Sequence, residues 1–351
     1  MRIALLALSS LVVVSSGVCS QTLEFASPRG IEFFEGNSSS NIMLGNYSAD
    51  TRVQQVDNSL VGLPLPAIRY LAWRRDGLGT GSANKTVTLE IVMAHSDFAT
   101  VSNTWASNYK DTPRTVFTKK AVSLPDWTTA SSKTPQEFDF QVKLDSPFIY
   151  NRTDAIVWDV INSNNALNAM PQDWQSTNIA HTYGDYPSDL GGGCATKNGA
   201  MRSDTAFRAD ATNIELGVKV TNGPSAAPIV LLVGASDPNI QLPNACGVLH
   251  VNPILLVGLG ATDANGFLPT TIGIQAPWNS SYTQVVLYTQ VLSLDVTSAT
   301  KPLVFSNGQL VSAPQQASTQ AVTVKRIYGT TPTSTSGTGP SVSACPTAYG
   351  I

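Results

Sequence analysis

The chain has 351 residues, enough for two domains of typical size and for a substantial hydrophobic core. Charged residues make up 13% of the sequence, about half of the ~25% typical of soluble proteins, and the formal net charge is −3. Lysine and arginine cluster only as pairs, such as Arg74–Arg75 and Lys119–Lys120. This composition excludes a nucleic-acid-binding protein, which needs many clustered basic side chains, and it indicates no charged partner.

The N-terminus has the pattern of a secretory signal peptide, which we assign to residues 1–20. Met1–Arg2 carries the positive charge, the apolar segment Ile3–Val14 is too short to span a bilayer, and small residues follow. We expect the mature chain to start near Gln21; lipidation at Cys19, as in a lipoprotein, is the alternative. No later segment is long and apolar enough to span a membrane, so we expect no transmembrane segment and a secreted protein, extracellular or at the cell surface.

Cleavage after residue 20 leaves three cysteines, Cys194, Cys246 and Cys345. In an oxidising compartment this odd number predicts one disulfide and one remaining thiol. Three pairings are open, and the sequence does not choose among them. We expect a structural bridge together with a buried free cysteine; an intermolecular bridge through Cys345 is the alternative.

Strand patterns dominate residues 21–208, which we predict to form an N-terminal β-sandwich domain. Thr86–His95 has the clearest pattern, because its apolar residues from Val87 to Met93 alternate with others at the two-residue period of a strand. Residues 163–208 are polar and irregular, and we expect a functional loop or a covering flap with short strands there. Further strands are predicted at Ile68–Trp73, Thr115–Leu124, Glu137–Leu144 and Ala155–Ile161, and a short helix or loop at Phe98–Trp105.

A second β-sandwich domain is predicted over residues 209–328. Apolar residues from Ile214 to Val220 alternate with other residues, and Thr283–Leu294 is long, β-branched and aromatic. Residues 329–351 carry no charge and are rich in Thr, Ser and Gly, which predicts a flexible C-terminal tail. The predicted fold class is therefore all-β, with two β-sandwich domains, jelly-roll or Ig-like, in tandem. Shorter strands are predicted at Pro228–Val233, Gly247–Val251, Ile272–Ile274, Pro302–Phe305, Leu310–Ser312 and Ala321–Tyr328.

Five strand and turn motifs stand out along the chain: Asp57–Leu60, Ile68–Gly77, Thr86–Glu90 with His95–Ser96, Gln290–Asp295 and Ser306–Gly308. With these motifs the chain resembles a group of uncharacterised secreted β-sandwich proteins of environmental bacteria. The resemblance implies a two-domain β-sandwich fold over most of the mature chain. It implies no activity and no catalytic residue.

The sequence contains no zinc-protease, Gly-x-Ser-x-Gly, phosphate-loop or dinucleotide-binding motif. We expect His95 to point inward from its strand and His250 to point outward. His181 lies near Asp185 and Asp189, but without the spacing of metal ligands. We therefore predict no catalytic residue, no metal centre and no cofactor.

Two groups of acidic residues have conceivable roles. Asp263–Gly266 begins like a calcium-binding loop, but no glutamate closes it at the required distance, so we expect an ordinary turn. Four carboxylates, Glu90, Glu137, Asp139 and Asp159, lie on predicted strands, where a suitable pair would serve glycoside hydrolysis. Alternation puts most of them opposite the apolar faces, so we expect them to be solvated.

Aromatic residues in loop-like stretches are the stronger candidates for a binding site. A flat ring packs on the apolar face of a sugar, and neighbouring polar side chains bind its hydroxyls. The alternative is that these rings plug the ends of the sandwiches. The candidates are Trp105, Tyr109, Trp127, Trp174, Tyr183 and Tyr186.

These features together favour a secreted, non-catalytic structural or surface protein that is self-assembling or adhesive. An exposed edge strand near Gln21–Phe34 would allow self-association by adding to a neighbour's sheet. The alternatives are a carbohydrate-binding module that uses the loop aromatics on cell-surface or matrix glycans, and a polysaccharide hydrolase that uses strand carboxylates.

Overall fold

The computed structural model shows an all-β protein: β-strands joined by loops and by three short 3₁₀ turns, with no α-helix among the described residues. The 3₁₀ turns are η1 (Phe98–Thr100), η2 (Trp105–Asn108) and η3 (Ser280–Gln284). The structure describes residues 24–28, 31–44, 50–63, 65–77, 81, 85–129, 135–163, 170–175, 182–185, 187–268, 272–315, 317, 323–331 and 333–351.

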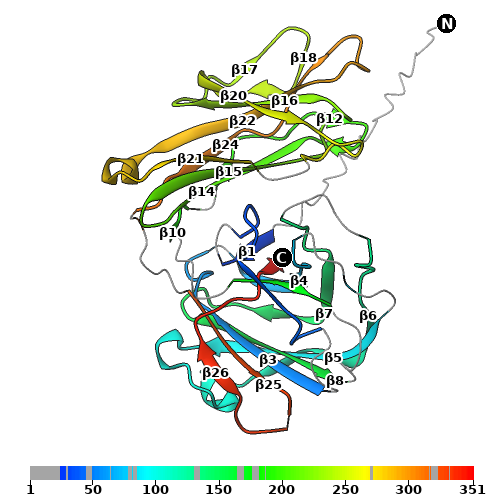
Figure 1. Cartoon of the computed structure of the whole chain (residues 1–351), viewed down its shortest axis with the longest axis vertical. Coiled ribbons are helices and arrows are strands. Elements are labelled where there is room, and N and C mark those ends of the chain that lie inside the picture. The colour runs from blue at the N-terminus through cyan, green and yellow to red at the C-terminus, as the bar shows by residue number, and fades with distance from the viewer. Residues whose placement is uncertain are drawn as a thin grey trace, which may run out of the picture.

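Two antiparallel sheets contribute to the first hydrophobic core (Figure 1). The four-stranded sheet has the order β1 (Glu24–Ser27), β27 (Thr347–Gly350), β4 (Ala67–Trp73), β7 (Phe140–Ile149). The six-stranded sheet has the order β26 (Thr338–Ser341), β25 (Val324–Gly329), β3 (Asp50–Asp57), β8 (Ala155–Ser163), β5 (Thr86–Ser96), β6 (Arg114–Ser123).

The alternation of β5 explains why this core forms. Every second residue of this strand is apolar and fully buried, as the sequence predicts: Val87, Leu89, Ile91 and Met93. Trp73 of β4 and Trp158 of β8 pack edge to face across the core, with ring centroids 5.8 Å apart. Residues far apart in the chain thus share one apolar interior.

Two further sheets contribute to a second core, which contains Leu216, Leu231 and Val291. The four-stranded sheet has the order β10 (Thr182–Tyr183), β14 (Arg202–Ala209), β15 (Asn213–Thr221), β21 (Ile272–Pro277). The seven-stranded sheet has the order β11 (Ser188–Asp189), β24 (Gln309–Ser312), β22 (Val286–Leu294), β16 (Pro228–Gly234), β20 (Pro253–Ala261), with β23 (Leu303–Phe305) beside β22 and β18 (Ala245–Cys246) beside β23.

Three two-stranded ribbons complete the described fold. They are β2 (Ser38–Ser40) with β9 (Gln172–Trp174), β12 (Ala195–Thr196) with β13 (Gly199–Ala200), and β17 (Ile240–Gln241) with β19 (Val248–Leu249). Several of these short strands fall within residues 163–208, where the sequence predicts a flap with short strands.

Strand β14 lies mostly within residues 163–208, which the sequence indicates to be irregular. The strand pattern is hidden there because some of its buried positions carry hydroxyl groups in place of apolar side chains. Ser203 Oγ lies 2.8 Å from Ser306 Oγ, and Thr205 Oγ1 lies 2.8 Å from Thr289 Oγ1. All four side chains are buried. Paired hydroxyls hydrogen-bond to each other and can therefore be buried. In the sequence the same polar residues look like a loop.

The expectation of a flexible C-terminal tail is wrong. Strand β27 lies between β1 and β4, and Tyr349 within it is fully buried. The Tyr349 hydroxyl donates to Asp57 Oδ2 at 2.9 Å and accepts from Trp158 Nε1 at 3.0 Å. Strand β25 pairs with β3 and therefore also belongs to the first pair of sheets. An uncharged sequence can be ordered when existing strands supply partners for its backbone.

The cysteines follow the expected arrangement of one bridge and one buried thiol. Cys194 and Cys246 form the disulfide, with their Cα atoms 5.6 Å apart. Cys345 is free and 1% exposed, so its position is incompatible with an intermolecular bridge from a mobile tail. Among the described residues no helix has the length and apolar character needed to cross a membrane.

The Tyr349 hydroxyl provides a test of how far the last strand stabilises the fold. Tyr349→Phe leaves the buried Asp57 carboxylate and Trp158 Nε1 without one partner each. We expect the free energy of unfolding in urea to fall by about 1–3 kcal/mol. Tyr282→Phe, in the half-buried turn η3, is the control and should change it little. An unchanged urea midpoint for Tyr349→Phe would mean that this network does not stabilise the protein.

Candidate functional site

Three of the six candidate aromatic residues are buried tryptophans. Trp105, Trp127 and Trp174 are 2%, 1% and 6% exposed. The Trp105 ring lies under the Arg52 guanidinium at 4.7 Å, and the Trp174 ring under that of Arg326 at 3.5 Å. Trp127 Nε1 donates to Asp139 Oδ2 at 2.9 Å. A sugar needs an exposed ring face, and these rings are covered by the protein itself.

The tyrosine candidates are also engaged. The Tyr109 hydroxyl donates to Asp159 Oδ2 at 2.7 Å, and burial together with that carboxylate raises the tyrosine's pKa. Tyr183 packs beside Phe34, with ring centroids 6.3 Å apart, and burial raises its pKa to about 12. Tyr186 lies outside the described residues. Trp105 and Tyr109 share Arg52 as a partner, and the other three described aromatics contact different residues.

Of the four candidate carboxylates, Glu90 and Asp159 lie on strands β5 and β8, whereas Glu137 and Asp139 precede β7, and three of them contact different partners. The expectation of solvation is wrong for Asp159, which is fully buried because Arg52 Nε donates to it at 2.7 Å. Glu137 pairs with Lys219 Nζ at 2.8 Å. Asp139 accepts from Trp127, while Glu90 on β5 is half-buried. Such contacts stabilise the folded chain, because a buried carboxylate needs donors around it.

Each described histidine has structural partners. His95 Nδ1 lies 2.6 Å from Asp111 Oδ2, and its Nε2 accepts from the backbone N–H of Asn151 at 3.1 Å. His250, expected to point outward, is 6% exposed, and its Nδ1 lies 3.2 Å from Asp237 Oδ2. Both nitrogens of His95 are thus occupied. His181 lies outside the described residues.

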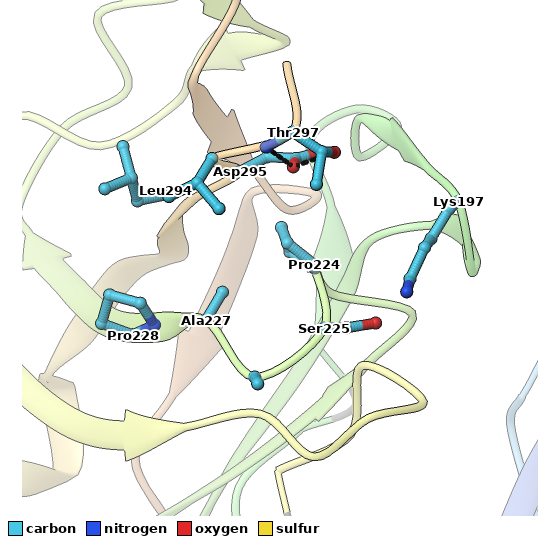
Figure 2. Close-up of a pocket in the computed structure, with 10 residues that line it drawn as sticks. Lys197, Pro224, Ser225, Ala227, Pro228, Leu294, Asp295 and Thr297 are labelled. Carbon is cyan, nitrogen blue, oxygen red and sulfur yellow. Dashed lines mark hydrogen bonds between the residues drawn. The ribbon is translucent and has the colours of Figure 1, made fainter. Parts of the chain in front are cut away.

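The Asp263–Gly266 turn and the surface hollow near Lys197 do not have the features of a binding site. Asp263 Oδ1 accepts from the backbone N–H groups of Asn265 and Phe267, which is the expected turn. A surface hollow near Lys197 and Asp295 has a volume of about 80 Å³, well below the ~300–1,000 Å³ of ordinary small-molecule sites (Figure 2).

The exposed edge of β20 is the most distinctive surface of the molecule. Among the described strands β20 pairs only with β16, so it forms one edge of the seven-stranded sheet (Figure 1). Ile254, Leu255 and Leu256 are 72%, 50% and 63% exposed. No charged residue occurs between Val251 and Thr262. Long apolar edges of this kind are unusual, because they can pair with another chain.

Cross-strand pairing shows why these side chains remain uncovered. Leu256 pairs with Leu232, which is buried on the outer face of the sheet by a cluster that includes Leu242 and Val251. That cover does not extend over Leu256. Irregular register near both ends of β20 confines regular pairing with β16 to Leu255–Gly258.

A second unusual feature is a group of acidic side chains at the end of β4. One carboxylate oxygen from each of Glu35, Asp76 and Asp173 lies within 4.8 Å of the others. Arg74 Nε donates to Asp173 Oδ2 at 2.8 Å, and Arg74 Nη2 donates to the Phe34 carbonyl at 2.7 Å. Burial, and secondarily the charge of Asp173, raise the pKa of Glu35 to about 7 and raise that of Asp76.

A neighbouring carboxyl group, Glu32, is still more perturbed. Burial raises its pKa to about 8, and the negative charge of Asp204 acts in the same direction. The positive charges of Arg74 and Lys219 only partly oppose this rise. Segment 31–36 therefore carries two carboxyl groups that are hard to ionise.

Comparison with known proteins identifies no relative: no protein family, no curated protein and no solved structure matches the chain.

Sequence reasoning missed both unusual features. Strand β20 was not among the predicted strands, although the run Ile254–Leu259 is apolar and could have indicated it; Gly258 and Gly260 weaken the strand pattern. The acidic group leaves no sequence signal, because its members are separated by 41 and 97 residues (76 − 35 and 173 − 76).

Replacing Trp174 distinguishes a packing role from a ligand-binding role. Trp174→Ala removes a buried indole from the first core and the surface on which Arg326 stacks. We expect the free energy of unfolding, measured in urea, to fall by about 3–5 kcal/mol. The half-buried Trp278→Ala should cost less. Unchanged stability with lost glycan binding on an array would show instead that Trp174 serves a ligand.

The carboxyl group of Glu32 generates a pH prediction. Its pKa in the folded protein, about 8, exceeds its ordinary value of 4.5, so the folded state holds a proton that the unfolded state releases. This contribution to stability is complete below pH 4.5 and is lost as pH rises toward 8. Glu32→Gln should reduce the decline in unfolding free energy over that window, whereas Glu90→Gln should not. Identical slopes for Glu32→Gln and the wild type would contradict the assignment.

Proposed function

We propose that the chain is a secreted, non-catalytic structural protein that associates with copies of itself through the edge of β20. The observation that carries this proposal is the uncharged edge strand with Ile254, Leu255 and Leu256 exposed. An unpaired strand edge offers backbone N–H and C=O groups to an incoming strand, and its apolar side chains gain by being covered.

A second copy of the same strand is the partner that this edge fits. Two β20 strands related by a twofold axis would pair antiparallel, so each side would meet an identical surface. Since residues 251–262 carry no charge, such pairing brings no like charges together. Leu256 on each copy would then continue the apolar outer face that Leu232 begins.

Strand β1, within the segment where an exposed edge was expected, also lies at the edge of its sheet. It has only four residues, against nine in β20. The longer edge offers more backbone hydrogen bonds to a partner, so we assign association to β20.

The alternative functions have weaker support. Glycan binding would need an exposed aromatic ring, but the three candidate tryptophans are buried. Hydrolysis would need a pair of carboxylates, but Asp159 and Glu137 contact separate partners. Secretion is part of the proposal because of the signal-peptide pattern, and the Cys194–Cys246 bridge suits an oxidising compartment. We also propose that each pair of sheets forms a β-sandwich, the second inserted into the first between β9 and β25.

Charge introduced on the β20 edge tests the proposal. Leu256→Lys places a charge where two edges would meet, and its side chain is exposed, so the fold should tolerate it. By sedimentation velocity over a wide concentration range, we expect the wild type to form dimers or larger species. The variant's dissociation constant should rise at least ~10-fold, or about 1.4 kcal/mol.

Val296→Lys is the matched control, since Val296 is 83% exposed but lies outside every strand. Its association should equal that of the wild type. A wild type that stays monomeric at all concentrations, or equal association of wild type and Leu256→Lys, would rule out this role for β20.

A further inference from the structure

The acidic group Glu35, Asp76 and Asp173 joins three separate segments of the chain. Asp173 lies on β9, Asp76 follows β4, and Glu35 belongs to the segment after β1. Backbone hydrogen bonds join the Asp76 and Asp173 segments: Asp76 N–H donates to the Pro171 carbonyl at 3.0 Å, and Asp173 N–H donates to the Arg74 carbonyl at 3.2 Å. The Glu35 segment is joined to them by the Gly36 N–H, which donates to Asp173 Oδ2 at 3.2 Å. The carboxylates therefore converge on a rigid frame.

The frame has little room for rearrangement. A Cβ atom on Gly36 would lie 2.1 Å from Asp173 Oδ1 and 2.5 Å from the Trp174 carbonyl oxygen, so only glycine fits beside the aspartate. The Gly77 N–H donates to Glu35 Oε1 at 2.5 Å, which fixes the glutamate. These contacts position oxygen atoms rather than leaving them on mobile side chains.

Two carboxylate oxygens of these residues lack partners although they are shielded from solvent. Asp173 is 1% exposed; its Oδ2 accepts from Arg74 and from the Gly36 N–H, while its Oδ1 has no hydrogen-bond partner among the described residues. Glu35 Oε2 is likewise buried and unpartnered there. Buried carboxylate oxygens without donors are costly, and a proton, a water or a cation would offset that cost.

The local charge favours a cation. Arg74 is the positive side chain whose field reaches both Glu35 and Asp76, and its Nε and Nη2 are already used by Asp173 and the Phe34 carbonyl. When all three carboxyl groups are ionised, the single guanidinium leaves two negative charges. A divalent ion would neutralise them.

We propose that Glu35, Asp76 and Asp173 bind a divalent oxygen-seeking cation, and that this ion is Ca²⁺. Carboxylates are the ligands that Ca²⁺ prefers, whereas Mg²⁺ usually keeps several waters and takes only one or two carboxylates. The three carboxylate oxygens lie within 4.8 Å of one another, which is close enough for one ion to contact all of them. Glu35 and Asp76 are half-buried, so water can reach the ion from their side and complete its coordination.

Occupancy of this site would also stiffen contacts with the second pair of sheets. Phe34, next to Glu35, lies under the Arg208 guanidinium at 3.7 Å and packs against Gly217 of β15. A cation that fixes segment 31–36 therefore fixes a residue on which β14 and β15 pack.

The test uses the full mature chain, freed of metal with a chelator and titrated with CaCl₂ by calorimetry and by thermal unfolding. We expect one saturable binding event and a Tm that rises with Ca²⁺. Asp76→Asn should abolish both. Its metal-free Tm should equal or exceed that of the metal-free wild type, because the substitution removes like-charge repulsion; this readout separates a lost ligand from a damaged fold.

Glu35→Gln should behave like Asp76→Asn, and Glu90→Gln on β5 should retain the full response. A wild-type Tm that is identical in chelator and in Ca²⁺ would overturn the proposal and indicate that a proton is shared among the carboxylates. An equal response from Asp76→Asn and the wild type would overturn the site. An equal rise with MgCl₂ would overturn the assignment to Ca²⁺.

Discussion

The fold depends on the pairing of the last strand, β27, with both β1 and β4. Without β27 the four-stranded sheet loses its second strand, and the buried hydroxyl of Tyr349 no longer joins Asp57 of β3 to Trp158 of β8. This network links the two sheets through hydrogen bonds inside an apolar core, where a buried donor or acceptor without a partner lowers the stability of the fold. The first core is therefore complete only when the end of the chain is in place.

The return of the chain to its first sheets constrains everything between β9 and β25. Those residues form the second pair of sheets, and they contact the first through segment 31–36 and through the Glu137–Lys219 ion pair at 2.8 Å. Charged and aromatic groups gather at this contact, where Arg208 stacks on Phe34. The acidic group proposed to bind Ca²⁺ lies beside it, so ion binding and the packing of the two halves would be coupled.

The need of buried polar groups for hydrogen-bond partners separates side chains that stabilise the fold from groups that are available to bind a partner. Trp105, Trp127 and Trp174, like Asp159 and both described histidines, each have at least one hydrogen bond or ring contact within the chain itself. Backbone groups at the β20 edge and carboxylate oxygens near Glu35 are among the groups that lack partners in the described part of the chain. An unpaired edge suits another strand, and unpaired oxygens suit a cation.

The sequence by itself determined the all-β class and the strands whose buried faces are apolar, such as β5 and β15, because a two-residue alternation is a local property. It also limited the cysteines to one bridge and one thiol. Tertiary structure alone decided the rest. Strand β14 buries hydroxyls that only partners such as Ser306 and Thr289 can satisfy, and β27 is ordered by strands more than 270 residues away (347 − 73). The exposure of β20 depends on where the apolar cluster around Leu232 ends. The convergence of Glu35, Asp76 and Asp173 depends on three chain segments meeting. Neither feature produces a periodic pattern in the sequence.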